Sequence, residues 1–295
     1  MRALFVCSGN TCRSPMAEAI GRRMGWEVRS AGTHAAAGAP VSEGARRALG
    51  RAGLSVPLEG SARPRAGLLA WADIVLTMER AQRDDLHRQF PWARPWTLTI
   101  GEWAGHAEDV ADPVGGGDDV YDATLHQIEG LLQRGEGRLP KVERAAWAAG
   151  SDHAGMDLKD LLARELDGRV IDVGTRVRES SDYPDFAEVV AWLVATGRAE
   201  RGLLVCGTGI GMSIAANKIP GIRAAAVWDV TSARLSRQHN DANVICLGER
   251  LIGPEAAKDT LAAFAEASFD GGRHQRRIEK IRHLDEMERG GRRDA

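Results

Sequence analysis

Near its beginning the sequence reads Phe5-Val6-Cys7-Ser8-Gly9-Asn10-Thr11-Cys12-Arg13-Ser14-Pro15. The apolar run from Ala3 to Val6 is typical of a buried strand, and Cys7 comes directly after it. Ser14 can cap a helix, and Pro15 suits the first helical position. The pattern therefore predicts a strand, a loop and a helix, with Cys7 at the carboxyl end of the strand.

The loop between Cys7 and Arg13 has the chemistry of an anion site. Backbone N–H groups at a helix N-terminus converge on an anion, and the same field favours a thiolate over a thiol. The planar guanidinium of Arg13 can bind two oxygens of a phosphate. The loop residues expected to contact the substrate are Ser8, Gly9, Asn10, Thr11, Cys12 and Ser14.

A thiolate that attacks phosphorus needs an acid for the leaving group and later a base for water. Asp112 is the candidate, because Pro113 keeps it extended within a glycine-rich loop. Asp109, Asp118 and Asp119 are the alternatives, since loop aspartates are commonly solvated turn residues.

The composition is that of a soluble globular protein, with 43% hydrophobic and 27% charged residues among 295. The formal net charge of −2 gives no electrostatic reason to expect nucleic acid or an anionic membrane as partner. Neither a membrane span nor a signal peptide is apparent, so a cytoplasmic location is expected. The four cysteines are Cys7, Cys12, Cys206 and Cys246, and their spacing predicts no disulfide framework, metal or cofactor.

Strand-like runs alternate with helical patterns along the whole chain, which predicts parallel sheets covered by helices. The expected fold class is α/β, with two doubly wound, three-layer domains in tandem over residues 1–138 and 142–295. Strands are expected near Ala3–Cys7, Glu27–Ala31, Asp73–Met78, Trp96–Thr99, Arg144–Ala149, Val170–Val173, Gly202–Cys206, Ala224–Trp228 and Val244–Leu247. Ligands of such sheets bind beyond the carboxyl ends of the strands.

A second cysteine loop, Leu204-Val205-Cys206-Gly207-Thr208-Gly209-Ile210-Gly211, also follows a predicted strand. Dinucleotide binding is one interpretation of such glycines, and Asp229 lies roughly where a ribose-binding acid would. The spacing is not GxGxxG, however, and the cysteine has no role in that site.

Aldose–ketose isomerisation is the interpretation that uses the cysteine. That reaction needs a base, donors for an enediolate oxygen and a group that opens the sugar ring. Cys206 can be the base with help from Thr208, and His239 can open the ring. Arg273 and Arg277 are four residues apart and are expected on one helical face, where they can hold a phosphate or simply be solvated. The amides expected to meet the oxyanion are those of Gly207, Gly209, Ile210 and Gly211.

Nearly all of residues 1–134 resemble the low-molecular-weight protein tyrosine phosphatase family. The similarity is carried by Val6–Glu18, by Arg29–Thr33 and by Asp112-Pro113. This resemblance implies that Cys7 is the nucleophile, Arg13 the phosphate ligand and Asp112 the general acid. It also implies that Asn10 braces the loop and that Ser14 donates to the thiolate.

Two positions point toward particular branches of that family. Val114 and glycines follow Asp112-Pro113, where tyrosine-specific members often have an aromatic residue, and Thr11 replaces a bulkier aliphatic. These features are similar to the protein-arginine phosphatase branch, in which Thr11 would orient water or accommodate a guanidinium; simple packing is the alternative.

A thioredoxin-coupled arsenate reductase would need more cysteines than Cys7 and Cys12. Cys12 is either structural or an oxidative disulfide partner of Cys7.

Residues from about 145 to 283 resemble type B ribose-5-phosphate isomerase. Four blocks in order carry this similarity: Gly150–Gly155, Cys206–Lys218, Ser236–Asn243 and Gly271–Gln275. The resemblance implies the same roles for Cys206, Thr208 and His239, and it implies that the reaction needs no metal. It also implies a homodimer in which the neighbouring subunit supplies the phosphate-binding arginines or the histidine. The implied sugar contacts are Asp152, His153, Tyr183 and Asn240.

Together these observations predict a bifunctional enzyme. One half would interconvert ribose 5-phosphate and ribulose 5-phosphate in the pentose phosphate pathway, and the other would be a phosphatase with a phosphocysteine intermediate. The alternative is an isomerase of another aldose phosphate, such as allose or galactose 6-phosphate, with the phosphatase half binding a phosphorylated ligand only.

Overall fold

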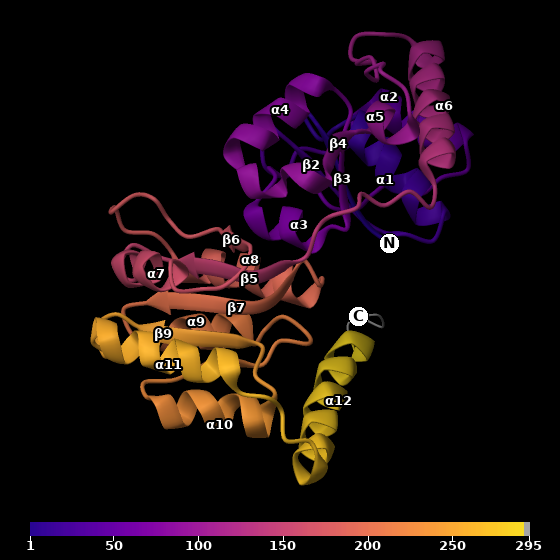
Figure 1. The fold of residues 1–295 in the computed structure, drawn as a ribbon. Helices are drawn as coiled ribbons and strands as arrows, with labels where there is room; N and C mark the ends of the chain where they lie inside the picture. The colour runs from indigo at the N-terminus through magenta and orange to yellow at the C-terminus, as the bar shows by residue number, and fades with distance from the viewer. Residues whose placement is uncertain (292–295) are drawn as a thin grey trace. The chain divides into compact units, whose positions relative to one another are not determined.

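The structure is a computed structural model that describes residues 1–291, with side chains described through Asp285. The chain divides into two compact units, one formed by Met1–Val142 and the other beginning at Glu143. Each unit is described by itself, and both contain a parallel sheet with helices (Figure 1). Among the described residues, none of the helices combines the length and apolar composition needed to cross a lipid bilayer.

The first unit contains a four-stranded parallel sheet in the order β2-β1-β3-β4. Its strands are β1 (Arg2–Cys7), β2 (Glu27–Gly32), β3 (Ile74–Thr77) and β4 (Thr97–Thr99). Its helices are α1 (Arg13–Arg23), α2 (Glu43–Arg51), α3 (Ala66–Trp71), α4 (Arg80–Gln89), the 3-10 helix η1 (Pro91–Trp96), α5 (Ile100–Ala104) and α6 (Asp118–Gly135).

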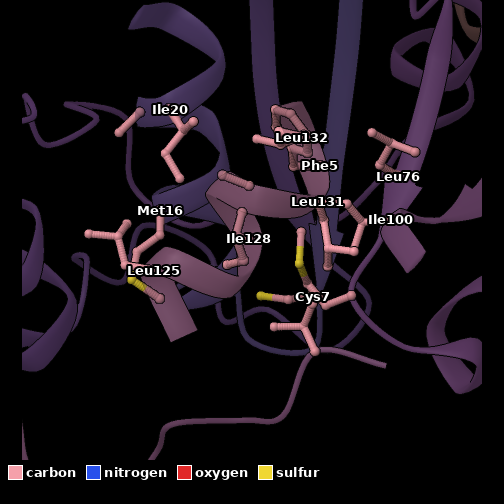
Figure 2. Close-up of a cluster of buried hydrophobic side chains, with 14 of the residues drawn as sticks. Phe5, Cys7, Met16, Ile20, Leu76, Ile100, Leu125, Ile128, Leu131 and Leu132 are labelled. Atoms are coloured by element: carbon pink, nitrogen blue, oxygen red, sulfur yellow. The ribbon is translucent and has the colours of Figure 1, made fainter. Parts of the chain in front are cut away.

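The core of the first unit holds the end of β1 in place. Phe5 of β1 and Leu76 of β3 belong to one buried cluster with Met16 of α1 and Ile128 of α6, as Figure 2 shows. Cys7 is part of the same cluster and is 2% exposed. Burial of these apolar side chains fixes β1 relative to α1, and therefore fixes the loop between them.

The second unit contains a five-stranded parallel sheet in the order β6-β5-β7-β9-β8. Its strands are β5 (Ala145–Ser151), β6 (Val170–Asp172), β7 (Ala199–Cys206), β8 (Ala224–Ala226) and β9 (Val244–Gly248). Its helices are α7 (Met156–Ala163), α8 (Tyr183–Ala195), α9 (Ile210–Ala216), α10 (Val230–Asn240), α11 (Pro254–Glu266), the 3-10 helix η2 (Gly272–His274) and α12 (Gln275–Gly291). The predicted fold class, two parallel α/β domains in tandem, is confirmed.

Two local predictions were wrong. Ser14 does not cap α1, because the helix begins at Arg13 and Cys12 occupies the cap position. Arg273 and Arg277 do not share one continuous helix, because Arg273 lies in η2 and Arg277 in α12. Gly271 and Gly272, directly before Arg273, adopt φ values of 63° and 52°, which are not helical, and α12 begins only at Gln275.

Candidate active sites

In the first unit the loop after β1 wraps around the sulfur of Cys7. The backbone N–H of Asn10 donates to Cys7 Sγ at 3.2 Å, and Ser14 Oγ lies 3.0 Å from the same sulfur. Asn10 adopts a φ of 55°, a left-handed conformation that is held by a hydrogen bond from the Ala62 N–H to its Oδ1 at 3.0 Å. The loop therefore directs two hydrogen-bonding groups at the predicted nucleophile.

Arg13 and Asp112 lie together at this loop. Arg13 Nη2 donates to Asp112 Oδ2 at 2.7 Å, and Arg13 Nη1 donates to the Val110 carbonyl at 2.9 Å. Arg13 is 1% exposed, whereas the Asp112 side chain is 44% exposed. A buried cation with an accessible carboxylate beside it can hold a phosphate while the carboxylate exchanges protons with the leaving group and water.

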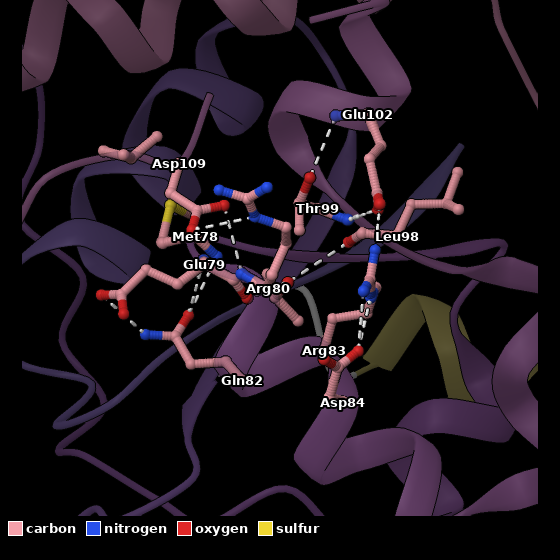
Figure 3. A network of polar contacts seen from close by, with 12 residues as sticks. Met78, Glu79, Arg80, Gln82, Arg83, Asp84, Leu98, Thr99, Glu102 and Asp109 are labelled. Atoms are coloured by element: carbon pink, nitrogen blue, oxygen red, sulfur yellow. Dashed lines mark hydrogen bonds and ion pairs between the residues drawn. The ribbon is translucent and has the colours of Figure 1, made fainter. Parts of the chain in front are cut away.

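Two of the other candidate aspartates, Asp109 and Asp118, are engaged elsewhere. Asp109 Oδ1 accepts from the backbone N–H of Arg80 at 3.2 Å, which ties Asp109 to α4 (Figure 3). A hydrogen bond from Arg47 lowers the pKa of Asp118, so Asp118 stays ionised in an ion pair with α2. Of the aspartates with described ion pairs in this region, Asp112 is the one that contacts Arg13.

Sequence reasoning missed Glu79, which also pairs with Arg13 Nη1. Glu79 forms a capping box with Gln82, and Gln82 Nε2 donates to Ser8 Oγ at 3.0 Å. This network, part of which Figure 3 shows, connects the start of α4 to both ends of the Cys7 loop. The available signal was the position of Glu79 just beyond β3, at the same sheet edge as Cys7.

Thr11 and Cys12 both form hydrogen bonds with Ser42, which lies just before α2. The Thr11 carbonyl accepts from the Ser42 N–H at 2.8 Å, and Cys12 Sγ donates to Ser42 Oγ at 3.0 Å. The hydroxyl of Tyr121 lies 3.8 Å from Cys12 Sγ. All four cysteines are free thiols in the described part of the chain. Gly9, the remaining predicted contact, is half-buried within the loop.

In the second unit the loop after β7 has a closely related geometry. The backbone N–H of Gly209 donates to Cys206 Sγ at 3.1 Å, and the Ile210 N–H donates to Thr208 Oγ1 at 3.4 Å. Gly209 has a φ of 78°, a left-handed conformation that a side chain would disfavour. Cys206 is 5% exposed and ends its strand, as Cys7 does in the first unit.

The sheet register brings further predicted residues to this loop. Ser151 of β5 pairs with Val205 of β7, so Asp152 lies at the same edge as Cys206. Asp152 is buried and its Oδ1 accepts from the Ala154 N–H at 3.0 Å. The next residue, His153, accepts a hydrogen bond at Nδ1 from the Ser181 N–H at 3.2 Å. The ring of Tyr183 packs against Gly211, in the first turn of α9 after the Cys206 loop, so closely that a Cβ on Gly211 would lie 2.6 Å from the ring.

Arg250 is a cation that sequence reasoning missed at this loop. Its guanidinium lies 3.3 Å from the position that a Cβ on Gly207 would occupy. The backbone N–H of Arg250 also donates to the Gly207 carbonyl at 3.1 Å. Arg250 follows β9, which pairs with β7, so it could have been found from strand order but not from local spacing.

His239 belongs to a separate cluster. Its ring stacks on His274 with centroids 4.3 Å apart and planes at 4°, and its Nε2 lies 4.0 Å from Asp270 Oδ2. Burial lowers the pKa of His274, and the neighbouring His239, Arg273 and Arg277 lower it further, so His274 is neutral at neutral pH. Arg273 Nε donates to His274 Nε2 at 3.2 Å.

This cluster has three potential metal ligands within 4.8 Å of one another, from His239, Asp270 and His274. The parallel rings do not suit a shared ion, because a metal in the plane of one imidazole lies outside the plane of the other. Among residues 1–285, no hydrogen bond or ion pair joins the cluster to the Cys206 loop. Asn240 lies beside it at the end of α10, where its carbonyl accepts from Arg223 Nε at 3.0 Å.

Comparisons with known proteins match the two units of the chain to two different families. A family model described as low molecular weight phosphotyrosine protein phosphatase matches residues 2–141, and a ribose/galactose isomerase model matches residues 148–281. Ribose-5-phosphate isomerase B of Escherichia coli K12 is 48% identical over 142 residues, covering 47% of this chain and 95% of the relative. D-erythrulose-4-phosphate isomerase of Pectobacterium atrosepticum is 42% identical over 146 residues, covering 48% of this chain and 96% of the relative. The solved YwlE arginine phosphatase from Geobacillus stearothermophilus is 39% identical, covers 45% of this chain and 88% of that chain, and has a TM-score of 0.43.

Proposed function

We propose that this chain, which belongs to the low molecular weight phosphotyrosine protein phosphatase family over residues 2–141 and to the ribose/galactose isomerase family over residues 148–281, is a bifunctional enzyme. One observation carries the proposal. Each unit presents a cysteine sulfur at the end of a strand of its sheet, with a backbone N–H of the following loop donating to that sulfur.

In the first unit the Cys7 thiolate attacks phosphorus while Arg13 holds the phosphate oxygens. The bond from phosphorus to the leaving oxygen or nitrogen breaks, and the leaving atom takes a proton from Asp112. Asp112 then accepts a proton from water as that water attacks the phosphocysteine, which releases phosphate and restores the thiolate. The contact between Asp112 and Arg13 supports these roles, because both groups meet where the phosphate would bind.

Residues near Asp112 and in the phosphate loop indicate which phosphorylated amino acid the substrate carries. Val114 is 66% exposed and offers no aromatic face for the ring of phosphotyrosine. Thr11 presents a small hydroxyl side chain in the phosphate loop. These features favour phosphoarginine over phosphotyrosine. The competing proposal, a module that only binds phosphorylated ligands, gives the Cys7 sulfur no role.

In the second unit Cys206 transfers the proton between neighbouring carbons of a sugar phosphate, with Thr208 beside it. The amides after Cys206 stabilise the enediolate oxygen, and His239 opens the ring. Arg273 and Arg277 hold the phosphate. Ribose 5-phosphate is the first expected substrate, with ribulose 5-phosphate as product. Four-carbon ketose phosphates and the 6-phosphates of allose or galactose are the alternatives.

The direct test measures both reactions on one preparation of the full chain. We expect ribose 5-phosphate to be converted to ribulose 5-phosphate faster than the alternative sugar phosphates. We also expect phosphate release from phosphoarginine peptides to exceed release from matched phosphotyrosine peptides. Turnover of neither peptide, with intact isomerisation, would contradict the phosphatase proposal and support a binding module.

A homodimer is part of the proposal, because no hydrogen bond or ion pair among the described residues joins Cys206 to the cluster of His239. On α9, Ile210 and Ile214 are four residues apart and are 46% and 59% exposed, as expected of a face that another subunit covers. We propose that each isomerase site combines Cys206 of one subunit with His239 of its partner.

Mixing two inactive variants tests this shared site. If Cys206→Ala and His239→Ala chains are co-refolded in equal amounts, half of the dimers are hybrids, and each hybrid has one intact site. Isomerase activity should therefore recover to about a quarter of the wild-type value in a two-fold symmetric dimer. Each variant refolded alone is the control. A mixture that stays inactive while size-exclusion chromatography shows dimers would mean that both residues act within one chain.

A further inference from the structure

One buried acidic side chain of the first unit has no part in the proposed reaction. Glu18 lies on α1, one turn after Ser14, and is 5% exposed. Burial raises the pKa of Glu18; the hydrogen bond from Ser30 and the charge of Arg22 oppose this shift, and Glu59 adds to it. A carboxyl group whose pKa is higher in the folded than in the unfolded chain stabilises the fold only at low pH, and above that pKa it costs stability. Stability at neutral pH therefore does not explain a carboxylate at this position.

A chain of four hydrogen bonds connects Glu18 to the sulfur of Cys7. Ser30 Oγ donates to Glu18 Oε2 at 2.5 Å, and Asn10 Nδ2 donates to Ser30 Oγ at 2.9 Å. Asn10 Nδ2 also donates to Ser14 Oγ at 3.0 Å, and Ser14 Oγ lies 3.0 Å from Cys7 Sγ. These side chains are buried or half-buried, so water competes little for the bonds between them.

The direction of donation is fixed at the Glu18 end. Ser30 has one hydroxyl proton, and because the carboxylate accepts it, the Ser30 oxygen is left to accept from Asn10. Asn10 Oδ1 accepts from the Ala62 N–H at 3.0 Å, which favours the same orientation of the amide from its other side. The amide protons of Asn10 therefore point toward the two serine oxygens.

At the other end, Asn10 fills an acceptor position of Ser14 Oγ and leaves the Ser14 proton free to turn. That proton can go to the Cys7 sulfur or to the Ala31 carbonyl, which lies 3.2 Å away. We propose that Glu18 is a positioning residue that sets the direction of this chain, so that Ser14 donates to Cys7 and stabilises the thiolate form that attacks phosphorus. This inference rests on the proposed role of Cys7 as nucleophile.

The substitution Glu18→Gln tests the direction while keeping the shape of the side chain. A glutamine amide nitrogen can donate to Ser30 Oγ, which turns the Ser30 proton toward Asn10 and opposes the Asn10 amide protons. On the full chain, the pH dependence of alkylation by iodoacetamide is followed for each cysteine by peptide mass spectrometry. We expect the Cys7 midpoint to rise by about one pH unit, so that alkylation below it slows about tenfold.

The same chain supplies the reference for this measurement. Cys206 lies in the other unit, and its alkylation profile should not move in the Glu18→Gln variant. Glu43→Gln is the matched control, because the Glu43 side chain is 88% exposed and lies on a different helix. Its Cys7 profile should coincide with that of the wild type.

Ser30→Ala breaks the chain at its next link and serves if Glu18→Gln does not fold. We expect it to move the Cys7 midpoint in the same direction, and the double variant to move it no further than the larger single change. Unchanged Cys7 profiles in these variants, with altered melting temperatures only, would overturn the inference. The readout is independent of turnover, so a shifted midpoint in a chain that releases no phosphate would contradict the proposed function and not the role of Glu18.

Discussion

Replacing Cys7 with serine is expected to abolish phosphate release and to leave sugar phosphate isomerisation unchanged. A serine hydroxyl is not ionised at neutral pH, and among the described residues the hydrogen-bonding groups at the sulfur are Ser14 Oγ and the Asn10 N–H, neither of which is a base that could take its proton. Loss of a covalent nucleophile costs up to about 10⁶-fold in turnover, so we expect a loss of at least about 10⁴-fold. Both activities are measured on the same preparation.

Isomerisation is the internal control in this experiment, because it reports that the chain is folded and correctly quantified. Phosphate binding should survive in the variant, since Arg13 and the loop amides are unchanged. Full phosphatase activity in Cys7→Ser would contradict the phosphocysteine mechanism. A parallel loss of both activities would show that the substitution damages the fold rather than the chemistry.

The loop after β1 shows how far local sequence patterns extend. The apolar run and the Ser14-Pro15 pair correctly predicted a strand, a loop and a helix, because these features act over a few residues. The same pattern wrongly made Ser14 the helix cap. In the structure the helix starts one residue earlier, so the Ser14 hydroxyl is free to face the sulfur of Cys7. Local propensity does not distinguish these two uses of a serine.

Residues that depend on strand order could not be predicted in the same way. Glu79 follows β3 and Arg250 follows β9, and each reaches a cysteine loop because its strand pairs with the strand that carries the cysteine. Strand order results from the packing of segments far apart in the chain, which local periodicity does not encode. The change from a 3-10 turn at Arg273 to an α-helix at Arg277 was likewise not predicted, because a spacing of four residues does not show where one helix type ends and the next begins.

Replacing Cys206 with alanine should produce the reverse of the Cys7 result. Removal of the base stops proton transfer between the sugar carbons, while phosphate release in the other unit continues. General bases contribute about 10²–10⁴-fold, and we expect a loss near the upper end because no other base contacts the amide loop after β7 in the described structure. The measurement is isomerisation of ribose 5-phosphate together with exchange of the substrate proton into deuterated water, and both should fall equally.

Cys246 provides the matched control, since it undergoes the same substitution on a neighbouring strand of the same sheet. Burial raises the pKa of the Cys246 thiol, and the nearby Cys206 raises it further, so Cys246 is neutral and takes no part in proton transfer. Cys246→Ala should lower stability by about 1 kcal/mol through the small cavity it leaves, and should keep isomerase activity within a few-fold. If Cys206→Ala still exchanged the substrate proton with deuterated water and Cys246→Ala did not, the base would have been assigned to the wrong sulfur. If neither variant lost exchange, a carboxylate such as Asp152, at the same edge of the sheet, would have to be the base.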